Sequence, residues 1–96
     1  MARNLGDFDG QVVLVVGAAS GIGRAVARLI ASRGGNVVIS DLDKKGLASL
    51  KEELSLKDNQ VRDVNLGDKS SVEALITSVI SDYAQIDALI NTAGIV

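Results

Sequence analysis

The chain has 96 residues, of which 47% are hydrophobic, and a formal net charge of −2 at pH 7. This length suits one small domain, and the charge, without a basic stripe, argues against nucleic acid or an anionic membrane as a partner. The chain contains no Cys and no His, which excludes disulfides, a thiol nucleophile and the commonest metal ligand. No apolar run is long enough to span a bilayer and no secretion signal is visible, so a cytoplasmic protein is expected.

The first half of the chain predicts two strands, each followed by a helix. Residues 11–17, QVVLVVG, form a β-branched run typical of a strand buried on both faces. Apolar residues then recur at helical spacing until Gly34 and Gly35, which are expected to end the helix. Its expected buried stripe consists of Ile22, Ala25, Val26, Leu29 and Ile30. Residues 36–40 predict a second buried strand, and residues 44–53 a weaker amphipathic helix.

The second half continues the alternation. Residues 60–64 are assigned to a strand mainly from their place in the pattern, and residues 86–91 to a fourth strand. The helix between them has a stripe that is expected to be core, namely Val72, Leu75, Ile76, Val79, Ile80 and Tyr83. Asp68 is one candidate N-cap of this helix, and a capping box of Ser70 and Glu73 is the other.

The element order βαβαβαβ defines the expected fold class. Strands that alternate with helices imply an α/β fold with a parallel sheet and right-handed crossovers. We therefore expect four strands in the order 3-2-1-4, with helices on both faces of the sheet.

The segment VVGAASGIGRA (residues 15–25) places three glycines between the first strand and the first helix. Glycine lets the backbone turn sharply and approach a ligand, and the N-terminus of the helix offers unpaired N–H groups to an anion. A tight connection without a ligand is the alternative, but the place of the turn in a βαβ unit favours phosphate binding. The predicted binding residues here are Gly17, Ala19, Ser20, Gly21, Ile22 and Gly23.

The spacing G-x-x-x-G-x-G, together with NTAG (residues 91–94) after the fourth strand, resembles the short-chain dehydrogenase/reductase family. Its members carry a T-G-x-x-x-G-x-G turn and an N-N-A-G segment at these places. The resemblance runs from about Phe8 to Val96 and implies a Rossmann-like fold, of which residues 1–96 are a single N-terminal half. The lack of Pro, Cys, His and Trp also fits an engineered or reconstructed fragment.

Two residues depart from the family pattern. Val16 stands where the family usually has threonine, and Thr92 where it usually has a second asparagine. The first change removes a hydroxyl that can hold the glycine turn to neighbouring backbone, and the second changes a polar group close to the cofactor. Both departures are expected to loosen the site.

Asp41 ends the second predicted strand and bears on the choice of cofactor. A carboxylate at this place can accept hydrogen bonds from both ribose hydroxyls and repels a 2′-phosphate. Asp41 can alternatively, or in addition, cap the second helix. NADP-binding members of the family tend to carry a basic residue where this chain has Ser20 or Leu42, so NAD is favoured over NADP.

The resemblance also implies contacts at the ends of the third and fourth strands. Asp63 and Val64 look like the pair that contacts adenine, the alternative for Asp63 being a solvated strand end. The segment after the fourth strand looks like the wall beside the cofactor, and its residues are Asn91, Ala93 and Gly94. Asn91 can equally stabilise the end of its strand. Lys44, mostly a solvated helix start, can approach a phosphate.

The family's catalytic residues have no counterpart in this sequence. Its members transfer hydride between a nicotinamide and an alcohol or carbonyl, with a tyrosine, a lysine four residues later and an upstream serine. The single tyrosine, Tyr83, is followed at that spacing by Asp87, which would raise the phenol pKa rather than lower it. We expect a non-catalytic domain that binds NAD or an adenosine nucleotide. Alternatively, it is one part of a split oxidoreductase, or a structural fragment without retained binding.

The fourth strand is expected to lie at an apolar edge of the sheet, because a fifth strand would pair with it in the whole fold. Unpaired backbone groups at such an edge are a template for pairing with another chain. The sequence therefore predicts a homodimer in which two copies of residues 86–91 pair antiparallel into one eight-stranded sheet.

Overall fold

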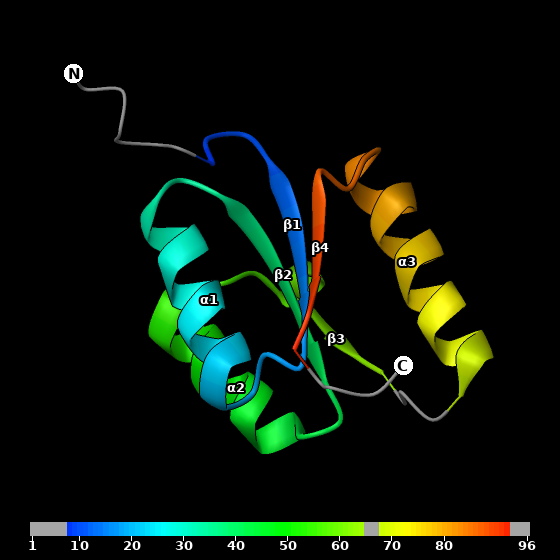
Figure 1. Cartoon of the computed structure of the whole chain (residues 1–96), viewed down its shortest axis with the longest axis horizontal. Helices are drawn as coiled ribbons and strands as arrows, with labels where there is room; N and C mark the ends of the chain where they lie inside the picture. Colours follow the sequence, from blue (N-terminus) through cyan, green and yellow to red (C-terminus); the bar gives the residue numbers. More distant parts are fainter. Residues whose placement is uncertain (1–7, 65–67, 93–96) are drawn as a thin grey trace.

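A parallel sheet with helices on both faces forms the structure, a computed structural model that describes residues 8–64 and 68–92 (Figure 1). The strands are β1 (Val12–Val16), β2 (Asn36–Asp41), β3 (Val61–Asp63) and β4 (Ala88–Asn91). The helices are α1 (Gly21–Ser32), α2 (Lys44–Leu54) and α3 (Lys69–Tyr83), and the short 3-10 helix η2 (Asp58–Gln60) leads into β3. The strand order β3-β2-β1-β4 confirms the predicted fold.

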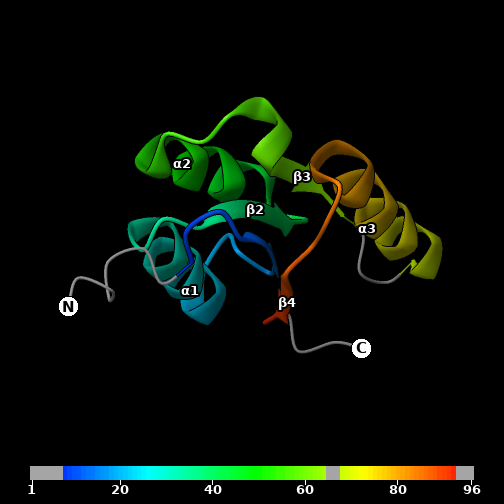
Figure 2. The ribbon, with the colours of Figure 1, turned by 90° about the horizontal axis from the view of Figure 1, so that it is seen from above.

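The helices divide between the two faces according to the direction in which the chain crosses the sheet. α1 and α2 carry the chain from β1 through β2 to β3 on one face, and α3 returns it to β4 on the other (Figures 1 and 2). This division is what right-handed crossovers require when the strand order reverses. The strand order reverses between β1 and β4, and the carboxyl ends of these two neighbouring strands mark the switch point at which such sheets bind ligands.

β1 is the centre of the hydrophobic core, and all five of its residues are buried. Val13 and Val15 pack on the side of α1 and α2, whereas Leu14 packs on the side of α3 with Leu75 and Val79. Burial of each such side chain contributes about 1.5–3 kcal/mol relative to exposure. A β-branched run flanked by two parallel neighbours is therefore a strong determinant of the fold.

The buried face of α1 differs from the predicted stripe. Gly23, Ala27 and Ile30 are buried, whereas Ile22 and Leu29 are 76% and 49% exposed. The reason is the glycine turn, because a Cβ on Gly23 would lie 2.1 Å from the carbonyl oxygen of Gly17. Small residues that let the helix approach the sheet therefore help to decide which face is buried, and only Ile30 among the large side chains of the predicted stripe is fully buried.

α3 begins after Asp68, whose carboxylate accepts a hydrogen bond from the backbone N–H of Ser70. The capping-box alternative is wrong, because Ser70 already lies inside the helix. The expectation that the whole stripe is core is also wrong at Ile80, which is 46% exposed. In the part of the chain that the structure describes, α3 is the only helix on its face, so its flank has no neighbour to pack against.

β3 forms the edge of the sheet opposite β4. It is shorter and more hydrophilic than β4. Gln60, predicted in the strand, belongs to η2, and its buried amide donates a hydrogen bond to the carbonyl of Val37 at 2.8 Å.

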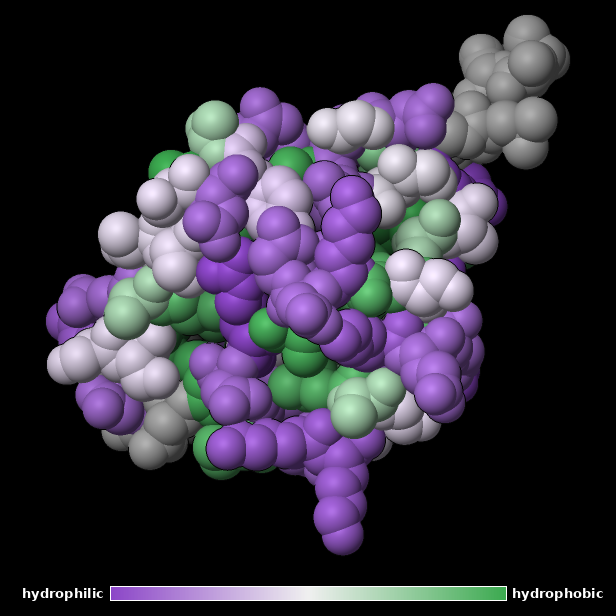
Figure 3. Space-filling model, turned by 180° about the vertical axis from the view of Figure 1, so that it is seen from behind, coloured by the Kyte–Doolittle hydropathy of each residue, from purple (hydrophilic) through white to green (hydrophobic). Residues whose placement is uncertain are grey.

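Figure 3 shows the molecule from behind Figure 1, where hydrophilic side chains surround the hydrophobic residues that reach the surface. None of the described helices is long and apolar enough to cross a membrane.

Candidate nucleotide-binding site

The predicted site residues that the structure describes gather at the carboxyl ends of the strands, at the lower end of the sheet in Figure 1. The glycine turn follows β1, Asp41 and Leu42 lie at the end of β2, Asp63 and Val64 at the end of β3, and Asn91 at the end of β4. Ala93 and Gly94 fall outside the described residues. A parallel sheet thus brings four sequence segments to one edge, where α/β proteins bind their ligands.

The glycine turn uses its glycines for two different purposes. Gly21, the first residue of α1, has φ +61°, and a Cβ built on it would meet nothing within 4 Å. Gly23 has no such space, because its Cβ would lie 2.1 Å from the Gly17 carbonyl oxygen and 2.3 Å from the hydroxyl of Thr92. The turn is therefore open to the outside at Gly21 and tightly packed on the inside at Gly23.

Neither the N-cap residue of α1 nor its first turn supplies a side chain that would offset the positive end of this helix. Ser20 is the N-cap with extended backbone, but its side chain makes no capping hydrogen bond, and the first turn contains no acidic residue. The first N–H groups of a helix have no intrahelical acceptor and sit at the positive end of the helix dipole. Such an end can bind a phosphate through backbone amides.

Asp41 holds the glycine turn from the neighbouring strand. Its Oδ2 accepts a hydrogen bond from the backbone N–H of Ala19 at 3.0 Å, and its Oδ1 accepts one from the N–H of Asp43 at 3.1 Å. The N-cap of α2 is Asp43, whose side chain accepts from the N–H of Gly46, so the helix-cap alternative for Asp41 is wrong. Two donors leave lone pairs free on the Asp41 carboxylate, which can accept about four hydrogen bonds.

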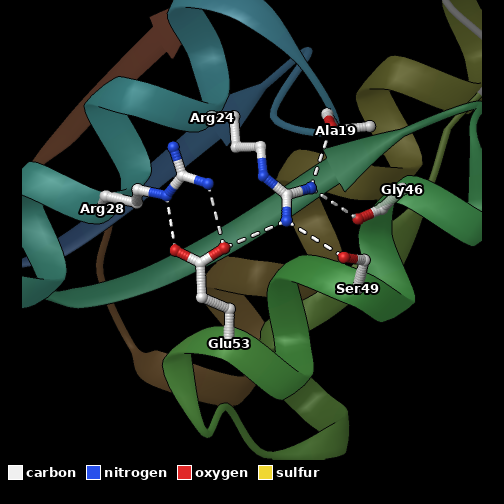
Figure 4. A network of polar contacts seen from close by, with 6 residues as sticks. All are labelled: Ala19, Arg24, Arg28, Gly46, Ser49 and Glu53. Atoms are coloured by element: carbon white, nitrogen blue, oxygen red, sulfur yellow. Dashed lines mark hydrogen bonds and ion pairs between the residues drawn. The ribbon is translucent and has the colours of Figure 1, made fainter.

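Arg24 also holds the glycine turn, through a different group than Asp41 does. The sequence pattern did not single out this arginine. Its guanidinium donates to the carbonyl of Ala19 at 3.1 Å and, from α1, reaches three groups of α2 (Figure 4). These groups are the carbonyl of Gly46 at 3.2 Å, the hydroxyl of Ser49 at 3.1 Å and the carboxylate of Glu53 at 3.1 Å. No local pattern reveals them, because they lie 22 to 29 residues further along the chain.

Glu53 is shared between two arginines. Arg28, one turn after Arg24, also forms hydrogen bonds to its carboxylate. The hydrogen bond from Arg28, aided by that from Arg24, lowers the pKa of Glu53 from 4.5 to about 2. A lowered pKa means that these contacts are fully present above pH 4.5 and are lost only as the pH falls towards 2.

The side chain of Thr92 supplies a hydroxyl near the glycine turn, where Val16 has none. The Thr92 hydroxyl lies 3.1 Å from the carbonyl oxygens of both Val16 and Gly17 and can donate its proton to either. A hydroxyl still holds the glycine turn, but it comes from the end of β4 rather than from β1. Within the glycine turn, the hydroxyl of Thr92 therefore supplies a contact that Val16 cannot make.

A small open pocket of about 260 Å³ lies at the end of β3, lined by Leu42, Lys44, Asp63, Val64 and Ser71. Drug-sized ligands occupy about 300–1,000 Å³, so this pocket suits a smaller group such as a nucleobase. The exposed Lys44 ammonium lies 3.5 Å from the Asp63 carboxylate, which gives this lysine a position the sequence did not predict. Ser71 was not predicted here either.

Two other polar residues lie at the carboxyl ends of β4 and β2. Asn91 is exposed and pairs in register with Val16 of β1, in keeping with either of the two roles considered for it. Ser40 is fully buried next to Asp41, and its hydroxyl finds no hydrogen-bond partner in the described part of the chain. An unsatisfied hydroxyl at a strand end costs stability unless water or a ligand reaches it.

Tyr83 lies away from this site and does not have the properties of a catalytic phenol. Its hydroxyl donates to the side-chain oxygen of Asn59 at 3.1 Å. Burial raises the pKa of Tyr83, with Asp82 adding to the rise and Arg62 opposing it. The direction of this pKa shift agrees with the expectation, but its main cause is burial, and the acid that adds to it is Asp82. The carboxylate of Asp87 instead accepts hydrogen bonds from the backbone N–H of Val12 and the side chain of Gln85.

Comparison with known proteins gives relatives along nearly the whole chain. The chain is 37% identical over 90 residues to the 3-oxoacyl-(acyl-carrier-protein) reductase FabG of Thermotoga maritima, covering 92% of this chain and 37% of that protein. It is also 37% identical over 89 residues to the 7alpha-hydroxysteroid dehydrogenase of Bacteroides fragilis, covering 91% of this chain and 34% of the relative. The chain thus spans little more than a third of the length of these relatives.

Solved structures agree with the sequence comparison. A short chain dehydrogenase/reductase from Burkholderia phymatum in complex with NAD superposes with a TM-score of 0.77 and 30% identity, over 86% of this chain and 30% of that one. A 3-ketoacyl-(acyl-carrier-protein) reductase from Brucella melitensis complexed with NADH gives a TM-score of 0.74 and 29% identity, over 86% and 34% of the two chains. Residues 11–96 match the family described as short chain dehydrogenase, and the chain belongs to that family.

Proposed function

We propose that the chain binds the adenosine and diphosphate portion of NAD at the carboxyl ends of its strands. In this proposal the backbone amides around Ser20 and Gly21 hold the phosphates, and Asp41 accepts the ribose hydroxyls. The pocket at the end of β3 holds the adenine against Leu42 and Val64. We also propose, as the family resemblance implies, that Asn91, Ala93 and Gly94 line the cofactor.

The main support for this proposal is that the glycine turn leaves the N-terminus of α1 uncapped by any side chain and open at Gly21. The end of α1 has neither a capping side chain nor an acidic residue, and Gly21 is open to the outside. A connection with no ligand would gain stability from an N-cap hydrogen bond worth about 1 kcal/mol, which this turn does without. The uncapped N-terminus of a helix, next to an open glycine and a carboxylate with free lone pairs, suits a phosphate attached to a ribose.

NAD is favoured over NADP by the charge of Asp41 and by the apolar residue that follows it. The Asp41 carboxylate would repel a 2′-phosphate, and the exposed Leu42 next to it offers no positive charge. Two family members of similar structure, named above, are in complex with NAD or NADH. Lys44 is the nearest cation to this position in the sequence, and it pairs with Asp63 instead.

We propose that residues 1–96 form one binding half of the family's fold and do not transfer hydride on their own. The single tyrosine donates to Asn59 and has a raised pKa, opposite to what a phenol needs for proton transfer near neutral pH. Two alternatives stay open: combination with a separate second half into an active oxidoreductase, and a fold that has kept its turn but lost binding.

A protein-detected NMR titration with NAD, and with NADP in parallel, tests the proposal. We expect the amides of residues 17–23 and around Asp41 to shift with NAD and to respond much less to NADP. Millimolar affinity, about −4 kcal/mol, is sufficient for the proposal, because half of the family's contacts belong to other segments. A dispersed spectrum that is indifferent to both cofactors would contradict nucleotide binding by this chain on its own.

We further propose that the chain self-associates through β4. This strand is last in the sheet order, and among the described residues no strand pairs with its outer edge. Leu89 at the centre of β4 is 51% exposed. Unpaired backbone groups beside an exposed apolar side chain favour pairing with a second copy of the same strand.

Replacement of Leu89 by Lys is expected to shift the protein from dimer to monomer at tens of micromolar, because a charged edge strand resists pairing. Leu29→Lys is the matched control, since Leu29 is exposed to a similar extent, 49%, but lies on α1. Sedimentation velocity measures the outcome. A wild-type monomer, or equal dissociation in both variants, would contradict self-association through β4.

A further inference from the structure

We propose that Arg24 is a positioning residue that orients the phosphate-binding amide of Ser20 by holding the carbonyl group of Ala19. This inference rests on the proposed nucleotide binding and assigns a role that neither the glycine pattern nor the predicted contacts contain. It concerns the conformation of the turn, not a direct contact of Arg24 with the ligand.

The geometry begins with one nitrogen of the guanidinium. Nη1 of Arg24 lies 3.1 Å from the carbonyl oxygen of Ala19 and 3.2 Å from that of Gly46, so it joins the glycine turn to α2 (Figure 4). The second nitrogen, Nη2, is held by Ser49 and Glu53, each at 3.1 Å. With four oxygen partners and a side chain that is only 18% exposed, the guanidinium is fixed in place.

Because the peptide unit is planar, a fixed carbonyl group of Ala19 also fixes the direction of the N–H of Ser20. The carbonyl of Ala19 and the N–H of Ser20 belong to the same planar peptide unit, and in a trans peptide they point in opposite directions. Because Arg24 holds the carbonyl towards α2, the N–H of Ser20 must point away from α2. This N–H lies at the N-cap of α1, among the amides that the proposed function assigns to the phosphates.

The preceding peptide is held as well. The N–H of Ala19 donates to Asp41 at 3.0 Å, so both peptide units of Ala19 are restrained by charged side chains from β2 and α1. A hydrogen bond to a cation also polarises a peptide and strengthens its N–H as a donor. Arg24 therefore both directs the Ser20 amide and makes it a better donor to an anion.

Arg28 provides a control within the same network. Both arginines lie on α1 and form hydrogen bonds to Glu53, but only Arg24 contacts the glycine turn. The lowered pKa of Glu53, about 2, means that both ion pairs are intact at neutral pH. A comparison of Arg24→Met with Arg28→Met separates orientation of the turn from attachment of α1 to α2.

The experiment measures binding of NAD, ADP and adenosine to the two variants by NMR, together with the amide shifts of Ala19 and Ser20 without ligand. In Arg24→Met we expect both amide shifts to move and the affinity for NAD and ADP to fall about fivefold, as expected for one weakened hydrogen bond. Adenosine affinity is expected to stay within twofold, because adenosine has no phosphate. Arg28→Met is expected to change neither the shifts nor the affinities.

Three results would overturn the inference. They are unchanged Ala19 and Ser20 shifts in Arg24→Met, an equal loss of ADP affinity in Arg28→Met, and an equal loss of adenosine and ADP affinity in Arg24→Met. The last of these would indicate general loosening of the fold. A wild-type chain that binds no nucleotide would contradict the proposed function, whereas the ligand-free shifts still decide whether Arg24 orients the turn.

Discussion

Gly23→Ala is expected to destabilise the chain by at least 3 kcal/mol, roughly the upper range for overpacking of a tight interior. The added Cβ would lie 2.1 Å from the carbonyl oxygen of Gly17 and 2.3 Å from the hydroxyl of Thr92. The Gly17 oxygen belongs to the backbone and cannot rotate away as a flexible side chain would. Relief of the clash requires α1 to move away from β1, which exposes buried residues of both elements.

Gly21→Ala is the matched control, because it adds the same methyl group two residues earlier without a clash. A Cβ at Gly21 meets nothing within 4 Å, but the residue has φ +61°. An alanine in this left-handed conformation costs about 1–2 kcal/mol. Urea unfolding followed by circular dichroism measures both variants. Equal destabilisation of the two would show that close approach at Gly23 is not what the turn requires.

The predictable part of this fold is the part set by local pattern. A β-branched run, helices at 3.6-residue spacing and short connections are enough to place β1, α1 and the strand order, because right-handed crossovers leave few alternatives. The pattern predicted the buried face of α1 only in part, since Ile30 is buried as expected. Ile22 and Leu29 satisfy helical spacing but are exposed, since the approach at Gly23 sets the rotation of the helix.

The residues of the candidate site likewise divide into those that the sequence pattern predicted and those that it did not. Motif spacing marked the glycine turn and Asp41, which the structure joins through the hydrogen bond from Ala19. Arg24 left no signal, because its partners lie on another helix and an arginine on a helix is ordinarily read as a solvated residue. The hydroxyl of Thr92 was missed for a related reason, since it acts on the end of a strand 76 residues earlier.

Asp41→Asn is expected to lower NAD affinity about tenfold or more and to remove the preference over NADP. The carboxylate accepts from Ala19 and Asp43 and, in the proposed site, from the ribose hydroxyls as well. A hydrogen bond to a charged group contributes about 1.5–3 kcal/mol, and 1.4 kcal/mol corresponds to tenfold in affinity. The neutral amide has one acceptor oxygen for these donors and no longer repels a 2′-phosphate.

Asp43→Asn makes the same change of charge two residues away and is the control for electrostatics at a distance. Asp43 caps α2 through the N–H of Gly46, a task that asparagine performs about as well. Its carboxylate is not among the groups that hold the glycine turn, so NAD affinity is expected to stay within twofold. Parallel NMR titrations of both variants with NAD and NADP measure the result. If Asp43→Asn matched Asp41→Asn, the cofactor preference would come from the summed negative charge at the end of β2. If only Asp41→Asn changed the cofactor preference, the preference would come from the Asp41 carboxylate alone. This carboxylate would then both hold the glycine turn and bind the ribose hydroxyls.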